Sequence, residues 1–158
     1  MVRVHAARIV AMARFYDIDD ANALLPELAT IVGVLGEQRT ELVRLRDEVL
    51  TAGNAGGEGA PTPVGGTTGG PDGSPISSEL RLTRLRMQGL IDQMAAGVAR
   101  IDALGLTLRD IEKGLVDFPA LVSGRQVWLC WQLGETSIGW WHGLDTGFDG
   151  RQPLAELA

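Results

Sequence analysis

A short motif near the end of the chain has the residue types and the spacing of a metal site. His142 and Asp145 form an H-x-x-D pair, which offers an imidazole nitrogen and a carboxylate oxygen to a divalent cation. Glu135 is too far away to complete this pair, because seven residues of extended strand span roughly 20 Å. A metal would therefore need other carboxylates, such as Asp110 or Glu112, brought near by folding. We favour the alternative that His142 is structural and hydrogen-bonds to Asp145 or to the backbone.

A second group of residues is expected to line a shallow groove on a sheet. If three strands pair as described below, Asp117, Cys130 and Gly139 fall in line across them, with Trp128 and Trp141 on either side. Two indole walls, one carboxylate and one thiol suit a small ligand or a side chain of a partner. The alternative, which we favour, is that the C-terminal tail or a second subunit covers this face.

Cys130 and Arg151 carry the remaining chemistry. A nucleophilic cysteine needs a nearby base, but His142 is predicted on the opposite face of the sheet, and the other histidine lies before the domain. We therefore predict no catalytic residue, and we leave open whether the protein is an enzyme. Arg151 follows a glycine-rich turn, where it would bind a ligand or partner, or would pair with Asp145 or Asp149.

Three strands are expected to position these groups, because the hydrophobic periodicity changes from that of a helix to that of a strand. The predicted strands cover residues 115–121, 126–133 and 138–142. A short helical piece is predicted just before them, over residues 106–113. Ser123-Gly124 and Gly134-Glu135 are typical of two-residue turns. With two such turns, Phe118 pairs with Leu129, and Leu129 pairs with Trp140.

This register divides the strand residues between two faces of the sheet. An apolar face, which should cover the helices, contains Trp131, Trp140 and His142. A mixed face contains the groove residues and Gln132. The outward-facing pair, Trp128 and Trp141, therefore marks the best surface for ligand or partner binding.

Two long helices are expected to support the sheet. Asp17 is a suitable N-cap for the first helix, and Pro26 should kink or restart it. Beyond Pro26, apolar residues repeat every seven positions, at Leu28, Leu35, Leu42 and Val49. The second helix should start at Ser77 or Ser78 and end before Gly105, with Leu80, Met87, Met94 and Ile101 in one row and Ile91 and Val98 in another. Because these apolar rows need a partner, we predict that the helices pack together as an antiparallel hairpin.

The segment between the helices has a different composition. Residues 53–75 contain nine glycines, four prolines and no aromatic residue, so we predict a disordered linker. Residues 1–14 are predicted to be a flexible extension, with Met12 as an alternative translation start. Residues 15–158 then form a single domain.

Composition excludes several classes of protein. The 158 residues are 45% hydrophobic and 22% charged, as expected for one folded domain. A net charge of -6, with no strongly basic stretch, argues against nucleic-acid binding. No apolar run approaches the roughly twenty residues that a membrane span needs. The single cysteine, Cys130, cannot form an internal disulfide, which favours a reducing cytoplasm. We predict no cofactor beyond the divalent metal that His142 and Asp145 leave open.

Two strings in the sequence resemble a known family. The segment DANALLP, at residues 20–26, is similar to the E-A-N-x-L-L-P opening of the bacterial family named domain of unknown function 2203. GLVDFP at 114–119, LCW at 129–131, WH at 141–142 and GRQPL at 150–154 resemble its C-terminal half. Asp20 replaces a glutamate of the family pattern, and the linker is longer than usual. The resemblance implies a small prokaryotic cytoplasmic protein and supplies no activity.

Taken together, these features predict an α+β fold, in which a long helical hairpin packs with a three-stranded antiparallel meander. We expect a non-catalytic interaction or scaffold module that self-associates, as a dimer, through apolar heptad surface of a coiled-coil type. The alternative is a metal- or ligand-binding protein that uses His142, Asp145, Asp117 and Arg151.

Overall fold

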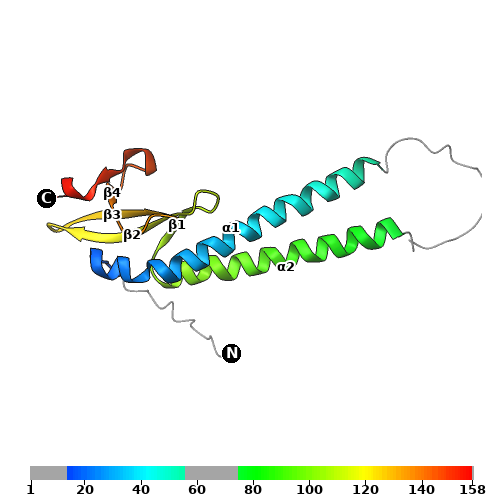
Figure 1. Cartoon of the computed structure of the whole chain (residues 1–158), viewed down its shortest axis with the longest axis horizontal. Coiled ribbons are helices and arrows are strands. Elements are labelled where there is room, and N and C mark those ends of the chain that lie inside the picture. Colours follow the sequence, from blue (N-terminus) through cyan, green and yellow to red (C-terminus); the bar gives the residue numbers. More distant parts are fainter. Residues whose placement is uncertain (1–13, 56–74, 158) are drawn as a thin grey trace, which may run out of the picture.

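The computed structural model describes residues 14–55 and 75–157, so the predicted N-terminal extension and most of the predicted linker lie outside the described residues. Two long antiparallel helices form a hairpin, and a five-stranded antiparallel sheet packs against one end of it (Figure 1). The predicted α+β class is confirmed. The sheet, however, has five strands rather than three.

Helix α1 (Ile18–Ala55) begins at the predicted cap, where the backbone N–H of Asp20 donates to Asp17 Oδ1 at 2.7 Å. Pro26 lies inside the helix and does not restart it. The helix also continues past Gly53, so its last turn occupies the start of the predicted linker. No helix among the described residues is both long and apolar enough to cross a membrane.

Helix α2 (Pro75–Ala103) begins before the predicted serine cap, with proline in the first turn, where no backbone N–H is required. Its C-terminus is as predicted. Gly105 has a φ of 74°, its N–H donates to the Asp102 carbonyl, and the N–H of Leu106 donates to the Ile101 carbonyl. These two bonds form a Schellman motif, which directs the chain from the helix into the sheet.

The sheet is a simple meander in which each strand pairs with its neighbours in the sequence. Its strands are β1 (Thr107–Asp110), β2 (Leu115–Val122), β3 (Arg125–Gln132), β4 (Trp140–His142) and β5 (Gln152–Pro153). The helical piece predicted over residues 106–113 is wrong, because Thr107–Asp110 forms the edge strand β1. Four residues are too few for periodicity to distinguish a strand from a helical turn, and pairing with β2 decides the outcome.

The core lies between the hairpin base and one face of the sheet. Leu28, Val32 and Leu35 of α1 are buried against Phe118 and Trp131 of the sheet. In the first heptad row, Leu28 and Leu35 are thus core residues, whereas Leu42 and Val49 are only partly buried. In α2, by contrast, Ile91 of the companion row is 45% exposed.

The predicted register is right for the first hairpin and wrong for the second. Phe118 pairs with Leu129, as expected, but Leu129 pairs with Trp141 and not with Trp140. Gly134-Glu135 is not a two-residue loop, because residues 133–139 separate β3 from β4. Within this connection, the N–H of Ile138 donates to Asn22 Oδ1 of α1 at 2.7 Å. A slip of one residue exchanges the two faces of a strand, so every face assignment in β4 is reversed.

Candidate metal centre

Three neighbouring strands each place one chemically active side chain on the face of the sheet that points away from the helices. Asp117 of β2 is directly opposite Cys130 of β3, and His142 of β4 is opposite Trp128. The prediction that His142 lies on the other face from Cys130 is therefore wrong. Asp117, Cys130 and His142 are all buried, with exposures of 1–3%, and their potential metal-binding atoms lie within 4.8 Å of one another.

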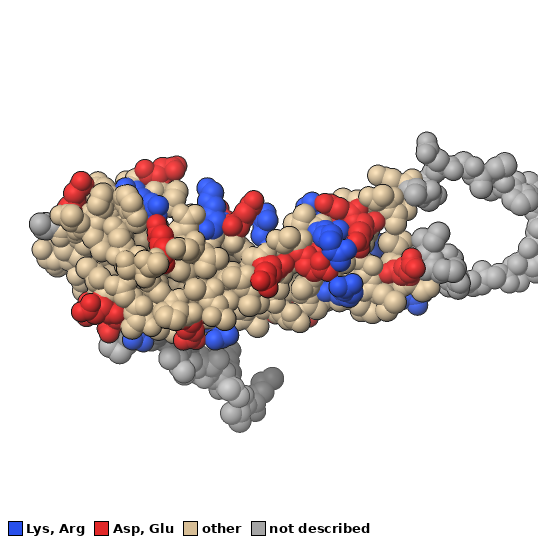
Figure 2. Space-filling view, viewed as in Figure 1, with Lys and Arg blue, Asp and Glu red and all other residues tan. Residues whose placement is uncertain are grey.

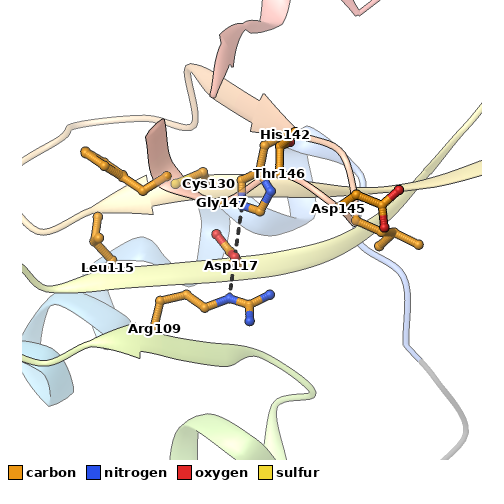
Figure 3. A pocket seen from close by; sticks show the side chains of 10 residues that line it. Arg109, Leu115, Asp117, Cys130, His142, Asp145, Thr146 and Gly147 are labelled. Carbon is orange, nitrogen blue, oxygen red and sulfur yellow. Dashed lines mark hydrogen bonds and ion pairs between the residues drawn. The ribbon is translucent and has the colours of Figure 1, made fainter. Parts of the chain in front are cut away.

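The C-terminal segment explains why a carboxylate is buried on an outer face. Residues 143–151, with a short 3₁₀ helix at Phe148–Gly150, cross over this side of the sheet. Between this segment and the sheet is a pocket of about 240 Å³ with the three side chains at its base (Figure 3). Leu115, Leu144 and Phe148 supply apolar wall, while Arg109, Asp145 and Thr146 supply polar groups.

Asp117 is at the centre of the polar contacts. Its Oδ2 accepts a hydrogen bond from Arg109 Nε at 2.7 Å and lies 3.0 Å from His142 Nε2. Its other oxygen, Oδ1, is buried and has no hydrogen-bond partner among the described residues. The Cys130 thiol also interacts with this carboxylate, but a buried carboxylate oxygen that lacks a strong donor is costly.

The Cys130 thiol is held in its neutral form. Burial raises its pKa to about 12, the Asp117 carboxylate adds to this increase, and the Arg151 guanidinium opposes it. A thiol with such a pKa is a poor nucleophile at neutral pH. His142 nevertheless lies in the same cluster, so the sequence argument that no histidine faces Cys130 is wrong.

His142 makes two ring contacts, both with acceptor atoms. Its Nδ1 lies 2.9 Å from the Gly143 carbonyl oxygen, which can only accept, so Nδ1 carries a proton and donates. Its Nε2 then points at Asp117, which is a second acceptor when ionised. A proton or a metal ion between Nε2 and this carboxylate would join the two groups.

Asp145 does not join this group, although the sequence pairs it with His142. It is exposed and stands apart from the three buried side chains at the side of the pocket (Figure 3). The other carboxylates considered for a metal are occupied elsewhere. Asp110 accepts from the N–H of Lys113, and Glu112 pairs with Arg39 at 2.7 Å.

The tryptophans are rearranged by the register shift. Trp128 lies on the outer face, as predicted, with the Arg109 guanidinium 5.0 Å from its ring centre. Trp141, predicted beside it, packs instead against the core, so these two rings do not form the predicted groove. Trp140 is the tryptophan that shares the outer face with Cys130.

Arg151 pairs with neither of the acidic residues considered from the sequence. Its guanidinium lies between the rings of Trp140 and Phe148, at 4.6 and 4.4 Å, and its Nη1 donates to Glu135 Oε1 at 3.2 Å. Stacking between two rings fixes the guanidinium beside Cys130. Glu135 also accepts from the N–H of Gln132, so it is a structural turn residue.

Arg109 is the site residue that sequence reasoning missed. It lies on β1, which was interpreted as helix, so no face could be assigned to it. Asp117 itself was the signal that pointed to such a residue, because a buried aspartate requires a nearby cation.

The fold and the site define an α+β protein with a helical hairpin, a five-stranded meander and a buried Asp–Cys–His cluster under its C-terminal segment. Residues 14–154 match the family described as "Uncharacterized conserved protein (DUF2203)", and the chain belongs to this family, as the resemblance implied. Searches of the curated proteins and of the solved structures gave no match.

Proposed function

We propose that this protein binds a divalent transition metal of the zinc type through Asp117, Cys130 and His142. The observation that carries this proposal is the convergence of three different ligand types, all buried, within 4.8 Å at the base of a pocket. Structural ion pairs explain two of these residues, but they leave Asp117 Oδ1 without a partner. A metal bound there satisfies that oxygen.

The surroundings of the cluster support each ligand in the manner of a metal site. The Gly143 carbonyl holds the His142 ring by Nδ1, so that Nε2 is directed at the cluster. Arg109 occupies Asp117 Oδ2, which leaves Oδ1 for the metal. Thiolate and imidazole together favour zinc and similar borderline metals over magnesium or calcium.

Three protein ligands would leave a coordination position for a water or a ligand from the pocket that they line. An open position is typical of zinc sites that bind an exchangeable water or ligand. Because the Cys130 pKa is about 12 in the metal-free protein, metal binding must displace the thiol proton. Metal affinity therefore increases with pH.

The test is titration of chelator-treated protein with Co²⁺, followed by its thiolate-to-metal absorption, and with Zn²⁺ by competition. We expect one metal per chain in the wild type and a loss of affinity of at least tenfold in Cys130→Ser, His142→Gln and Asp117→Asn. Asp145→Asn is the matched control, because it changes a carboxylate of the same pocket outside the cluster, and it should bind normally.

Absence of stoichiometric metal in the folded wild-type protein would refute the proposal. So would an Asp145→Asn variant as impaired as Asp117→Asn. Circular dichroism of each metal-free variant separates loss of ligands from loss of fold.

A second role, self-association through the hairpin, is favoured by the distal half of the helices. Leu50, Leu82 and Leu85 are 59–64% exposed, although they lie on long helices away from the sheet. Asp47 and Glu48 of α1 already pair with Arg46 and Arg44 of the same helix, so the exposed leucines alone carry this argument. A second copy that packs antiparallel would cover them.

The compartment follows from the same chemistry. We infer that the protein acts in a reducing cytoplasm, because a metal-binding thiol must stay reduced and the chain carries no second cysteine.

A further inference from the structure

Arg109 offers hydrogen-bond donors that the described structure does not use. Its Nε donates to Asp117 Oδ2. The neighbouring acid on β1, Asp110, accepts instead from the backbone N–H of Lys113. No ion pair or hydrogen bond among the described residues involves its two terminal nitrogens. The side chain is 45% exposed, and it lines the pocket.

The position of this guanidinium is fixed rather than free. The bond to Asp117 holds one edge, and the Trp128 ring, 5.0 Å away, supports one face. The remaining end of the guanidinium presents a planar fork of N–H groups, which matches the two oxygens of a carboxylate. It lines the same pocket as the three proposed metal ligands (Figure 3).

The guanidinium and the proposed metal are joined through one carboxylate. Arg109 Nε and His142 Nε2 both contact Asp117 Oδ2, at 2.7 and 3.0 Å. A ligand bound to the metal from the pocket would share that pocket with Arg109. With a thiolate and a carboxylate as ligands, a divalent metal site is neutral, and Arg109 makes it cationic. Asp145, which is exposed at the side of the pocket, reduces this positive charge but does not fill the site.

The pocket also limits the size and character of the ligand. Its volume of about 240 Å³ lies below the roughly 300–1,000 Å³ that is typical of pockets for drug-sized ligands. Leu115, Leu144 and Phe148 suit a short apolar chain.

We propose that the pocket binds a small monocarboxylate, with one carboxylate oxygen on the metal and the carboxylate also held by the Arg109 fork. This inference rests on the proposed metal site. The apolar part of the ligand lies against the leucines and Phe148.

The experiment uses Co²⁺-loaded protein and the probe propionate, with propionamide as an uncharged probe of the same size. Propionate should change the visible cobalt spectrum saturably, and propionamide should bind at least tenfold more weakly. Metal-free protein, followed by ligand-observed NMR, should bind propionate at least tenfold more weakly than loaded protein.

Arg109→Gln should weaken propionate binding at least tenfold, while Arg125→Gln, an exposed arginine outside this pocket, should leave it unchanged. If Arg109→Gln no longer binds cobalt, the comparison of propionate with propionamide in the wild type tests whether the pocket prefers a carboxylate. Equal effects of the two probes, or equal binding to metal-free protein, would overturn this inference alone. Failure of the wild type to load cobalt would instead refute the metal site itself.

Discussion

Cys130 shows how burial changes the chemistry of a single residue. A thiol on the outer face of a sheet is normally hydrated, but here the C-terminal segment covers it and Asp117 lies opposite. Both effects favour the neutral form, so the thiol keeps its proton unless a cation replaces it. The same cover turns Asp117 and His142 from surface groups into a buried pair, which is why their contacts must be satisfied.

Cys130 gives a prediction about alkaline stability. In metal-free protein its pKa is about 12, against 9.0 for an ordinary thiol, so the unfolded chain loses this proton first as pH increases. The contribution is fully present below pH 9 and is lost as pH approaches 12. Burial also raises the pKa of Tyr16, which acts in the same direction.

Urea unfolding at a series of pH values measures this effect. We expect the free energy of unfolding to fall by on the order of 2 kcal/mol between pH 9 and about pH 11. Cys130→Ala should make the decline shallower. An identical pH dependence in the variant would show that the thiol is not responsible.

At the scale of elements, the connections between strands determine which side chains each strand places on each face of the sheet. The β2–β3 turn at Ser123 and Gly124, both with positive φ, gives the register that its sequence predicts. The β3–β4 connection does not, because it is tied to α1 through Asn22, and no local pattern contains that bond. One hydrogen bond between segments 116 residues apart is thus associated with the exchange of His142 and Trp141 between faces.

Gly114 gives a prediction at this scale, because it joins β1 to β2 at a close contact. Its φ is 65°, and a Cβ there would lie 2.5 Å from Leu133 Cβ and 3.2 Å from Val32 Cγ1. Gly114→Ala should therefore destabilise the protein by about 2–4 kcal/mol, from backbone strain and from overpacking. Thermal and urea unfolding measure the loss.

Gly139→Ala is the matched control for this substitution. Gly139 also lies in a connection of the sheet, but its φ is not positive, and no atom lies within 4 Å of its hypothetical Cβ. It should change stability by less than about 1 kcal/mol. Equal losses in the two variants would mean that the contact at Gly114 is not decisive.

At the scale of the whole molecule, the sheet stabilises only one end of the hairpin. Figure 1 shows both helices extending well beyond the sheet, and Figure 2 shows side chains of both signs over that distal part. Ion pairs such as Glu41–Arg86 link the two helices there, but they are exposed and contribute little. The apolar surface of the distal half therefore remains available for a second copy.

Sedimentation velocity over a range of concentrations tests self-association. We expect a concentration-dependent dimer for the wild type and a monomer for the double variant Leu82→Glu and Leu85→Glu. Leu121→Glu, which changes a leucine of the sheet that is 51% exposed, should dimerise as the wild type does. A wild type that stays monomeric at high concentration contradicts the proposal.

The sequence by itself determined the elements whose information is local. A capping aspartate, a heptad row and a Schellman glycine define the hairpin, because each acts within one or two helical turns. Period-two patterning and a two-residue turn likewise defined the β2–β3 hairpin and placed Asp117 opposite Cys130. Tertiary structure alone decided the rest. A long connection sets the β4 register, an edge strand brings in Arg109, and the C-terminal segment buries the outer face, because each depends on contacts between residues distant in the chain.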